Sequence, residues 1–254
     1  MKKLSISLLT LAIGSQLMLP ALMAGDRRFS YVYEATTSAK GEIEIENFVT
    51  WKTKPSGHEP ANQFDFRHEI EYGLTDRFQL GLYVADWKVV SNKNTAIYQD
   101  TALEGIYNLT NPVTDLIGSG LYGEVKLGDQ KFELEGKLLL QKNFGPVVLA
   151  YNVGIEAEWE GDRFGYFNER SGEFMQSFGA SYQITPAFFV GGEFLHEIGF
   201  AEWSEASDPL LYAGPNLSYR FWDHYFITTT TLFQVTQLSD EPNFQWRMIF
   251  GMHF

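Results

Sequence analysis

Residues 244–254, FQWRMIFGMHF, alternate between large apolar side chains and mostly polar ones with a period of two. Successive side chains of a β-strand point to opposite faces, so this strand would have one very apolar face and one mostly polar face. Such a strand fits the wall of a membrane barrel, where one face meets lipid and the other a wet lumen. The pattern therefore predicts a transmembrane β-barrel.

The N-terminus has the layout of a secretory signal peptide, with two lysines, a mostly apolar stretch and a small-residue region that ends at Ala24. We expect residues 1–24 to be cleaved, which leaves residues 25–40 as a short periplasmic segment and residues 41–254 as the barrel. The alternative is a single membrane anchor. The polar residues that interrupt the apolar stretch, and its short length, argue against it.

The composition narrows the choice further. Apolar residues make up 44% of the chain. Beyond residue 24, no run reaches the roughly 18 apolar residues that a spanning helix needs, and a closed barrel is the other structure that satisfies every backbone group in lipid. The chain has no cysteine, which excludes disulfides, thiolate metal sites and a cysteine nucleophile. Its net charge of −13 argues against nucleic acid as a partner.

Twelve short alternating segments follow one another between residues 41 and 254, joined by connections that alternate in length. We therefore predict an all-β fold, a 12-stranded antiparallel transmembrane β-barrel of the outer-membrane type with both termini on the periplasmic side. A soluble barrel with its apolar face inside, or a β-sandwich, would also alternate. The segments are expected near 41–53, 62–73, 77–88, 97–109, 118–127, 131–142, 146–160, 173–184, 187–199, 209–220, 224–237 and 243–254.

Aromatic residues gather at the predicted strand ends, as expected where amphipathic rings meet the lipid head groups. Tryptophans fall at the outer ends and tyrosines at the periplasmic ends. The expected aromatic belts are formed by Trp51, Trp87, Trp159, Trp246, Tyr72, Tyr107, Tyr182 and Tyr219.

Charged residues occupy the opposite face of the same strands. A lysine or arginine at the lipid mid-plane costs roughly 2–4 kcal/mol, so this face should line the lumen. The result is either a wet acidic passage or an interior plugged by acid–base pairs, and acids outnumber bases. The candidate lumen-lining residues are Glu42, Glu44, Glu46, Asp65, Arg67, Glu69, Glu71, Glu104, Glu124, Lys126, Glu133, Glu135, Lys137, Glu156, Glu158, Glu193, Arg220 and Arg247.

No catalytic, cofactor-binding or metal site is expected. A lipid-modifying enzyme needs a nucleophile beside a base, but His196 is expected on the lipid face, whereas the strand serines face the lumen. His68 is expected to face lipid in isolation. His58 and His253 have no metal-ligand spacing.

The stretch from Tyr31 to Val84 contains a Lys40–Gly41 opening, an alternating acidic strand and the sequence EYGLTDRF at 71–78. These motifs resemble an uncharacterised family of bacterial outer-membrane β-barrel proteins. They are also similar to barrels associated with aromatic (phenol) degradation pathways and described as candidate transporters. The terminal Phe254 resembles the ending of outer-membrane barrels, which implies recognition by the barrel-assembly machinery. The resemblance implies the barrel fold, the outer membrane and transport.

The sequence thus predicts a protein of the Gram-negative cell outer membrane that is not an enzyme. We expect a passive channel or transporter for small polar or cationic solutes through an acidic lumen, with outer-membrane lipid and a small-molecule solute as partners and no cofactor. Two alternatives stay open: a structural or surface-interaction barrel with an occluded lumen, and a lipid-modifying enzyme.

Overall fold

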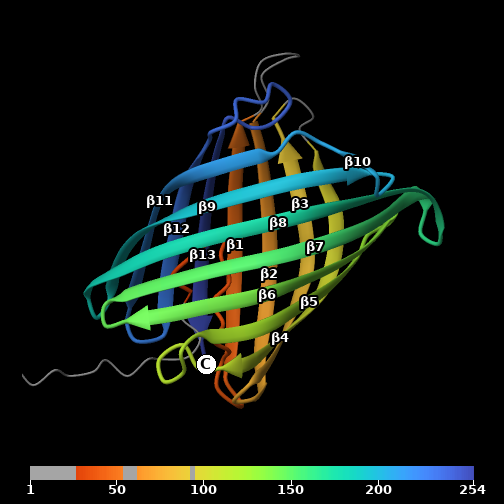
Figure 1. Cartoon of the computed structure of the whole chain (residues 1–254). Coiled ribbons are helices and arrows are strands. Elements are labelled where there is room, and N and C mark those ends of the chain that lie inside the picture. The colour runs from red at the N-terminus through yellow and green to blue at the C-terminus, as the bar shows by residue number, and fades with distance from the viewer. Residues whose placement is uncertain (1–26, 54–61, 92–94) are drawn as a thin grey trace, which may run out of the picture.

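The computed structural model describes residues 27–53, 62–91 and 95–254. Most of these residues form one closed antiparallel sheet, and the strands wrap around a common axis (Figure 1). The predicted 12-stranded barrel is confirmed, with one two-residue strand added at its rim. Within these ranges, no helix is long and apolar enough to cross a membrane. The signal-peptide prediction concerns residues 1–24, which lie outside the described residues.

Each long strand pairs with its neighbours in the chain, and the first strand pairs with the last to close the cylinder. The closed ladder satisfies the backbone groups that an open sheet edge would leave unpaired. The strands are β1 (Ile43–Thr53), β2 (Asn62–Thr75), β3 (Phe78–Val90), β4 (Ala96–Thr110), β5 (Gly118–Leu127), β6 (Lys131–Phe144), β7 (Val147–Arg163), β8 (Tyr166–Thr185), β9 (Phe188–Ala201), β10 (Glu205–Ala206), β11 (Leu210–Phe221), β12 (Tyr225–Gln234) and β13 (Phe244–His253).

The two faces of the wall differ in the way the alternation predicts. Apolar side chains such as Leu103 and Ile155 are 53% and 67% exposed on the outer face. Inside, Ile249 of β13 is fully buried and Glu69 of β2 has no exposed surface. The exposed apolar side chains therefore point away from the barrel axis, as they do in a barrel that sits in lipid.

β7 and β8 are longer than the sequence predicts. The expected outer connection at residues 161–172 is mostly strand, because the pairing of β7 with β8 continues to Arg163 and Tyr166. The chain reverses at Gly165, whose φ of +85° suits glycine. This prediction was wrong because the polar sequence of the hairpin has no apolar face to mark it as strand.

Gly251 of β13 leaves room for a buried ring. Its neighbour across the ladder is Phe226 of β12, and a Cβ atom at residue 251 would lie 2.1 Å from that ring. We expect Gly251→Ala to lower the free energy of unfolding by roughly 1–3 kcal/mol, a typical cost of overpacking. Urea unfolding in detergent micelles, followed by tryptophan fluorescence, measures the loss.

Gly123→Ala is the matched control for this prediction. Gly123 lies in β5, faces outward, and the nearest atom to its added Cβ would be 4.0 Å away. Equal unfolding midpoints for the two variants would contradict a steric role for Gly251.

Candidate functional site: the lumen and its N-terminal segment

The first described residues of the chain lie inside the barrel. Phe29, Val32, Ala35 and Ser38 are each at most 3% exposed, and Figure 1 shows this part of the chain, in red, enclosed by the strands. The sequence predicts a short periplasmic segment at 25–40; residues 27–38 instead fill part of the lumen. We call residues 27–38 the inner segment.

Polar side chains of the wall hold the backbone of the inner segment. Tyr33 N–H donates to Asn152 at 2.7 Å, Ala35 N–H to Gln141 at 2.7 Å, and Ser38 N–H to Gln79 at 2.8 Å. An unpaired buried backbone amide costs free energy comparable to a lost hydrogen bond. The wall therefore supplies to this irregular chain the partners that a neighbouring strand would supply.

Glu193 of β9 is the strongest of these anchors. Its carboxylate accepts hydrogen bonds from the backbone N–H groups of Ser30 at 2.9 Å, Tyr31 at 2.7 Å and Val32 at 3.0 Å. Asn216 and Thr230 donate to the same carboxylate. Hydrogen bonds to an ionised acceptor are about twice as strong as neutral ones, so this buried carboxylate ties the segment to β9.

Arg27 supplies positive charge to the most acidic part of the lumen. Its guanidinium lies 3.2 Å from Glu46, 3.4 Å from Glu71 and 3.8 Å from Glu69. Burial works against the charge, but Glu46 and the other nearby acidic groups outweigh it and hold the pKa of Arg27 well above its ordinary value. Arg28 pairs with Glu34 within the same segment.

The structure places the predicted lumen residues on the inner side of the wall, and Glu42, just ahead of β1, accepts a hydrogen bond from Ala39 N–H. The acids among them are the more deeply buried. Nine are buried: Glu44, Glu46, Glu69, Glu71, Glu104, Glu124, Glu133, Glu135 and Glu193. The others are half-buried: Glu42, Asp65, Arg67, Lys126, Lys137, Glu156, Glu158, Arg220 and Arg247.

Many of these charges pair across strands. Arg67 lies 2.5 Å from Asp86 and 3.0 Å from Glu124. Lys126 of β5 forms an ion pair with Glu133 of β6, and within β6 Lys137 lies 2.6 Å from Glu135. The acids and bases along the inner face of the wall therefore neutralise much of each other's charge.

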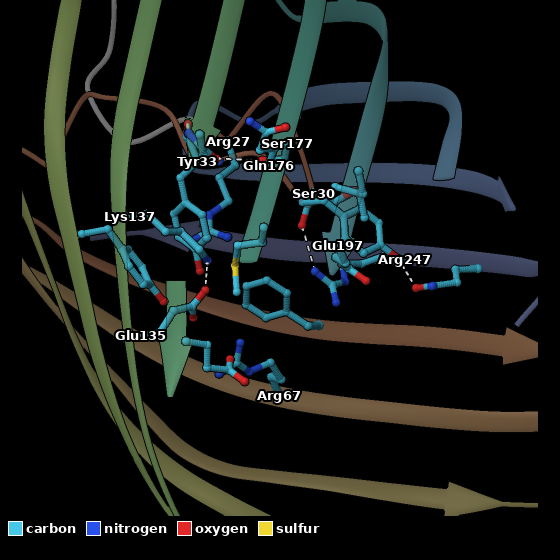
Figure 2. Close-up of a pocket in the computed structure, with 18 of the residues that line it drawn as sticks. Arg27, Ser30, Tyr33, Arg67, Glu135, Lys137, Gln176, Ser177, Glu197 and Arg247 are labelled. Atoms are coloured by element: carbon cyan, nitrogen blue, oxygen red, sulfur yellow. Dashed lines mark hydrogen bonds and ion pairs between the residues drawn. The ribbon is translucent and has the colours of Figure 1, made fainter. Parts of the chain in front are cut away.

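A cavity of about 400 Å³ remains between the inner segment and the wall (Figure 2). A second cavity, of about 40 Å³, lies on the other side of Arg27 and Tyr33, next to Glu71 and Gln79. The inner segment thus divides the lumen. The larger cavity is lined by Arg27, Ser30, Tyr31, Tyr33, Phe48, Lys52, Arg67, Tyr122, Lys126, Glu135, Lys137, Asn152, Glu156, Met175, Gln176, Ser177, Leu195, Glu197, Gln245 and Arg247.

Sequence reasoning missed the uncharged side chains that anchor the inner segment. Gln79, Gln141 and Asn152 point inward in the same alternation as the predicted acids. That alternation alone could have identified them as lumen-facing. The expectation that His68 is isolated was wrong. Its ring forms hydrogen bonds with Asn47 at 2.9 Å and Trp87 at 3.2 Å, which lie outward on the neighbouring strands. The sequence could not show these contacts, because they depend on how neighbouring strands are paired.

Outward aromatic side chains mark both ends of the strands. The tyrosines proposed for the belts, Tyr72, Tyr107, Tyr182 and Tyr219, are 43–50% exposed. The tryptophans are partly exposed, and Trp51, Trp87 and Trp159 pack against outward phenylalanines of neighbouring strands. Trp246 is half-buried and faces Trp51 across the β1–β13 ladder.

Two groups of three carboxylates come within metal-binding distance of one another among the described residues. They are Glu46 with Glu69 and Glu71, and Glu133 with Glu156 and Glu158. Each group already contains a basic side chain, Arg27 in the first and Lys131 in the second. These bases already bring to each group of carboxylates the positive charge that a metal ion would bring.

Comparison with known proteins identifies the family. The family of unknown function DUF6662 matches residues 21–245, most of the chain. The chain belongs to the DUF6662 family. No curated protein matches it.

Solved structures similar to this DUF6662 barrel are outer-membrane barrels. The COG4313 outer membrane channel from Pseudomonas putida F1 is 13% identical, with a TM-score of 0.63, covering 87% of this chain and 98% of that chain. The NanC porin is 11% identical, with a TM-score of 0.53 and coverage of 84% and 98%. The translocator domain of the autotransporter NalP from Neisseria meningitidis is 10% identical, with a TM-score of 0.53 and coverage of 85% and 90%. These likenesses show the fold, which several functions share.

Proposed function

We propose that the protein is an outer-membrane channel through which small polar solutes diffuse. The observation that carries the proposal is the cavity of about 400 Å³ inside a closed barrel, lined mostly by polar and charged side chains. A barrel of twelve strands lies between filled eight-stranded barrels and open porins of 16 strands or more. The likeness to a channel and a porin supports the same function.

A structural or surface-interaction barrel with an occluded lumen is the second candidate. The inner segment favours it, because residues 27–38 separate the large cavity from the smaller one. In this case the protein would act through its exposed loops and its lipid-facing surface.

The proposal includes the export route and partners expected from the sequence. Residues 1–24 would be removed as a signal peptide, and the barrel-assembly machinery would recognise the strand that ends at Phe254. Lipid would then cover the exposed apolar side chains of the outer face. The outer-membrane fold of similar structures supports this location.

Single-channel recording in planar lipid bilayers tests the proposed function. We expect the wild-type protein to give small, steady conductance steps, because the inner segment narrows a lumen that stays polar. Insertion is checked in parallel with a variant that lacks residues 27–38. Steps from that variant alone would support the occluded barrel, and the absence of steps from both proteins would reject the channel.

A further inference from the structure

The charges that face the large cavity differ in sign from the charges of the wall as a whole. Six basic side chains line the cavity, against three acidic ones. The buried acids lie behind the bases: Glu124, for example, is 3% exposed and pairs with Arg67, which does reach the cavity. The surface that a solute would meet is therefore basic, although the lumen contains more acids than bases.

Arg247 of β13 is the base whose charge is least compensated. Its Nε donates to Thr50 Oγ1 at 2.9 Å and its Nη1 donates to the carbonyl oxygen of Ser30 at 3.2 Å. Both acceptors are neutral. Among the described residues, no carboxylate forms an ion pair with Arg247 within 4.0 Å, and Glu197 lines the same cavity beyond that distance. Its Nη2 is not a donor in any hydrogen bond to these residues.

The surroundings fix the guanidinium in one orientation. It lies over the ring of Tyr31, with its central carbon 3.9 Å from the ring centroid. Figure 2 shows Arg247 beside Ser30 of the inner segment. Because stacking and the hydrogen bonds of Nε and Nη1 hold the planar guanidinium in place, its Nη2 is preorganised to donate to a carboxylate oxygen.

Elsewhere in the cavity, a second base lies among aromatic rings. Lys137 of β6 pairs with Glu135 and lies 4.8 Å from the ring centroid of Tyr33 and 4.5 Å from that of Tyr122. The cavity thus combines a cation that has no carboxylate within 4.0 Å among the described residues with apolar ring surface. Its volume lies at the small end of ligand pockets, which typically measure about 300–1,000 Å³.

We propose that this cavity binds a small organic anion through a carboxylate held by Arg247, with the tyrosine rings against the apolar part of the ligand. The inference deepens the proposed function, because the bound anion would be the solute that the channel passes. It departs from the cation preference expected from the sequence. Binding itself requires only the cavity and can be measured without conduction.

Isothermal titration of the detergent-solubilised full-length protein tests the proposal with three probes of nearly equal size. Benzoate is anionic, benzyl alcohol neutral and benzylamine cationic. We expect benzoate to bind most tightly and benzylamine least, with benzoate binding weakened by added salt. Benzylamine binding as tightly as benzoate, or no saturable binding of benzoate, would overturn the proposal.

The variant Arg247→Gln locates the site. Loss of a charge-assisted hydrogen bond should weaken benzoate binding about tenfold or more. Arg163→Gln removes one positive charge from the outer end of β7, beside Tyr166, and should leave binding unchanged. Equal benzoate affinities for the two variants would place the site elsewhere and reject Arg247.

The probe series on the wild-type protein decides the proposal even if Arg247→Gln fails to fold. Conductance separates the inference from the proposed function. Benzoate binding without channel activity would remove the channel and keep the anion site. Channel activity without benzoate binding would keep the channel and reject the anion site.

Discussion

Deleting residues 27–38 should raise the single-channel conductance several-fold. The inner segment lies within the lumen, with Phe29 and Val32 almost fully enclosed, so its removal joins the two cavities that it now separates. The twelve-stranded ladder takes none of its backbone pairing from this segment, so the barrel should still close. Recording in planar bilayers measures the change.

The same deletion should shift selectivity towards cations. It removes Arg27, the basic side chain between Glu46, Glu69 and Glu71, and leaves these carboxylates facing an open lumen. The acidic passage expected from the sequence is then a property of the barrel without its inner segment. The reversal potential in a salt gradient measures the shift.

Substitution of Glu193 provides a milder version of this experiment. Glu193→Gln keeps the size of the side chain but removes the charge that accepts three backbone N–H groups. We expect brief openings to the conductance of the deletion variant. Glu169→Gln, in the exposed part of β8, is the matched control and should behave like the wild type. Identical conductance in the deletion variant and the wild type would show that the segment does not obstruct the pore.

Replacing Arg27 with methionine should produce the largest loss of stability. Removing one partner of a buried charge cluster typically costs about 3–5 kcal/mol, because the remaining charges lose their compensation. Glu46 and Glu69 have no exposed surface, so water cannot replace the guanidinium without movement of the inner segment. Urea unfolding in lipid vesicles, followed by tryptophan fluorescence, gives the change in unfolding free energy.

Arg170→Met is the matched control for Arg27→Met. Arg170 pairs with Glu202 at 3.1 Å, but both side chains are more than half exposed, and such pairs contribute about 1 kcal/mol or less. Mild acid should restore part of the stability lost in Arg27→Met, because protonated carboxyl groups no longer repel one another. Equal losses in the two variants would mean that Arg27 does not compensate the cluster.

The strands could be predicted from sequence because lipid and the lumen impose opposite demands on alternate residues. Residues such as Glu44 and Ile43 in β1 show this directly, and the predicted strand ends differ from the observed ones by a few residues at most places. The exception is the β7–β8 hairpin, where neither face is continuously apolar.

The inner segment could not be predicted in this way. Its partners, such as Asn152 and Glu193, lie more than 100 residues away in the chain, and no local pattern marks them as acceptors for its backbone. The charge facing the cavity also depends on contacts between strands: Arg67 of β2 pairs with Glu124 of β5, although β3 and β4 lie between these strands in the sheet. Counting acids and bases along the strands cannot show which of them a solute meets.

The far ends of β7 and β8 extend as a two-stranded hairpin past the ends of the ladders with β6 and β9. β9 pairs with β8 only as far as Ser171, so residues 166–170 have β7 as their sole ladder partner. A membrane-crossing strand needs about 9–11 residues, and β7 and β8 have 17 and 20. An epitope tag inserted at Gly165 would therefore stand clear of the lipid head groups, where antibodies could report surface display of the intact barrel without touching its interior.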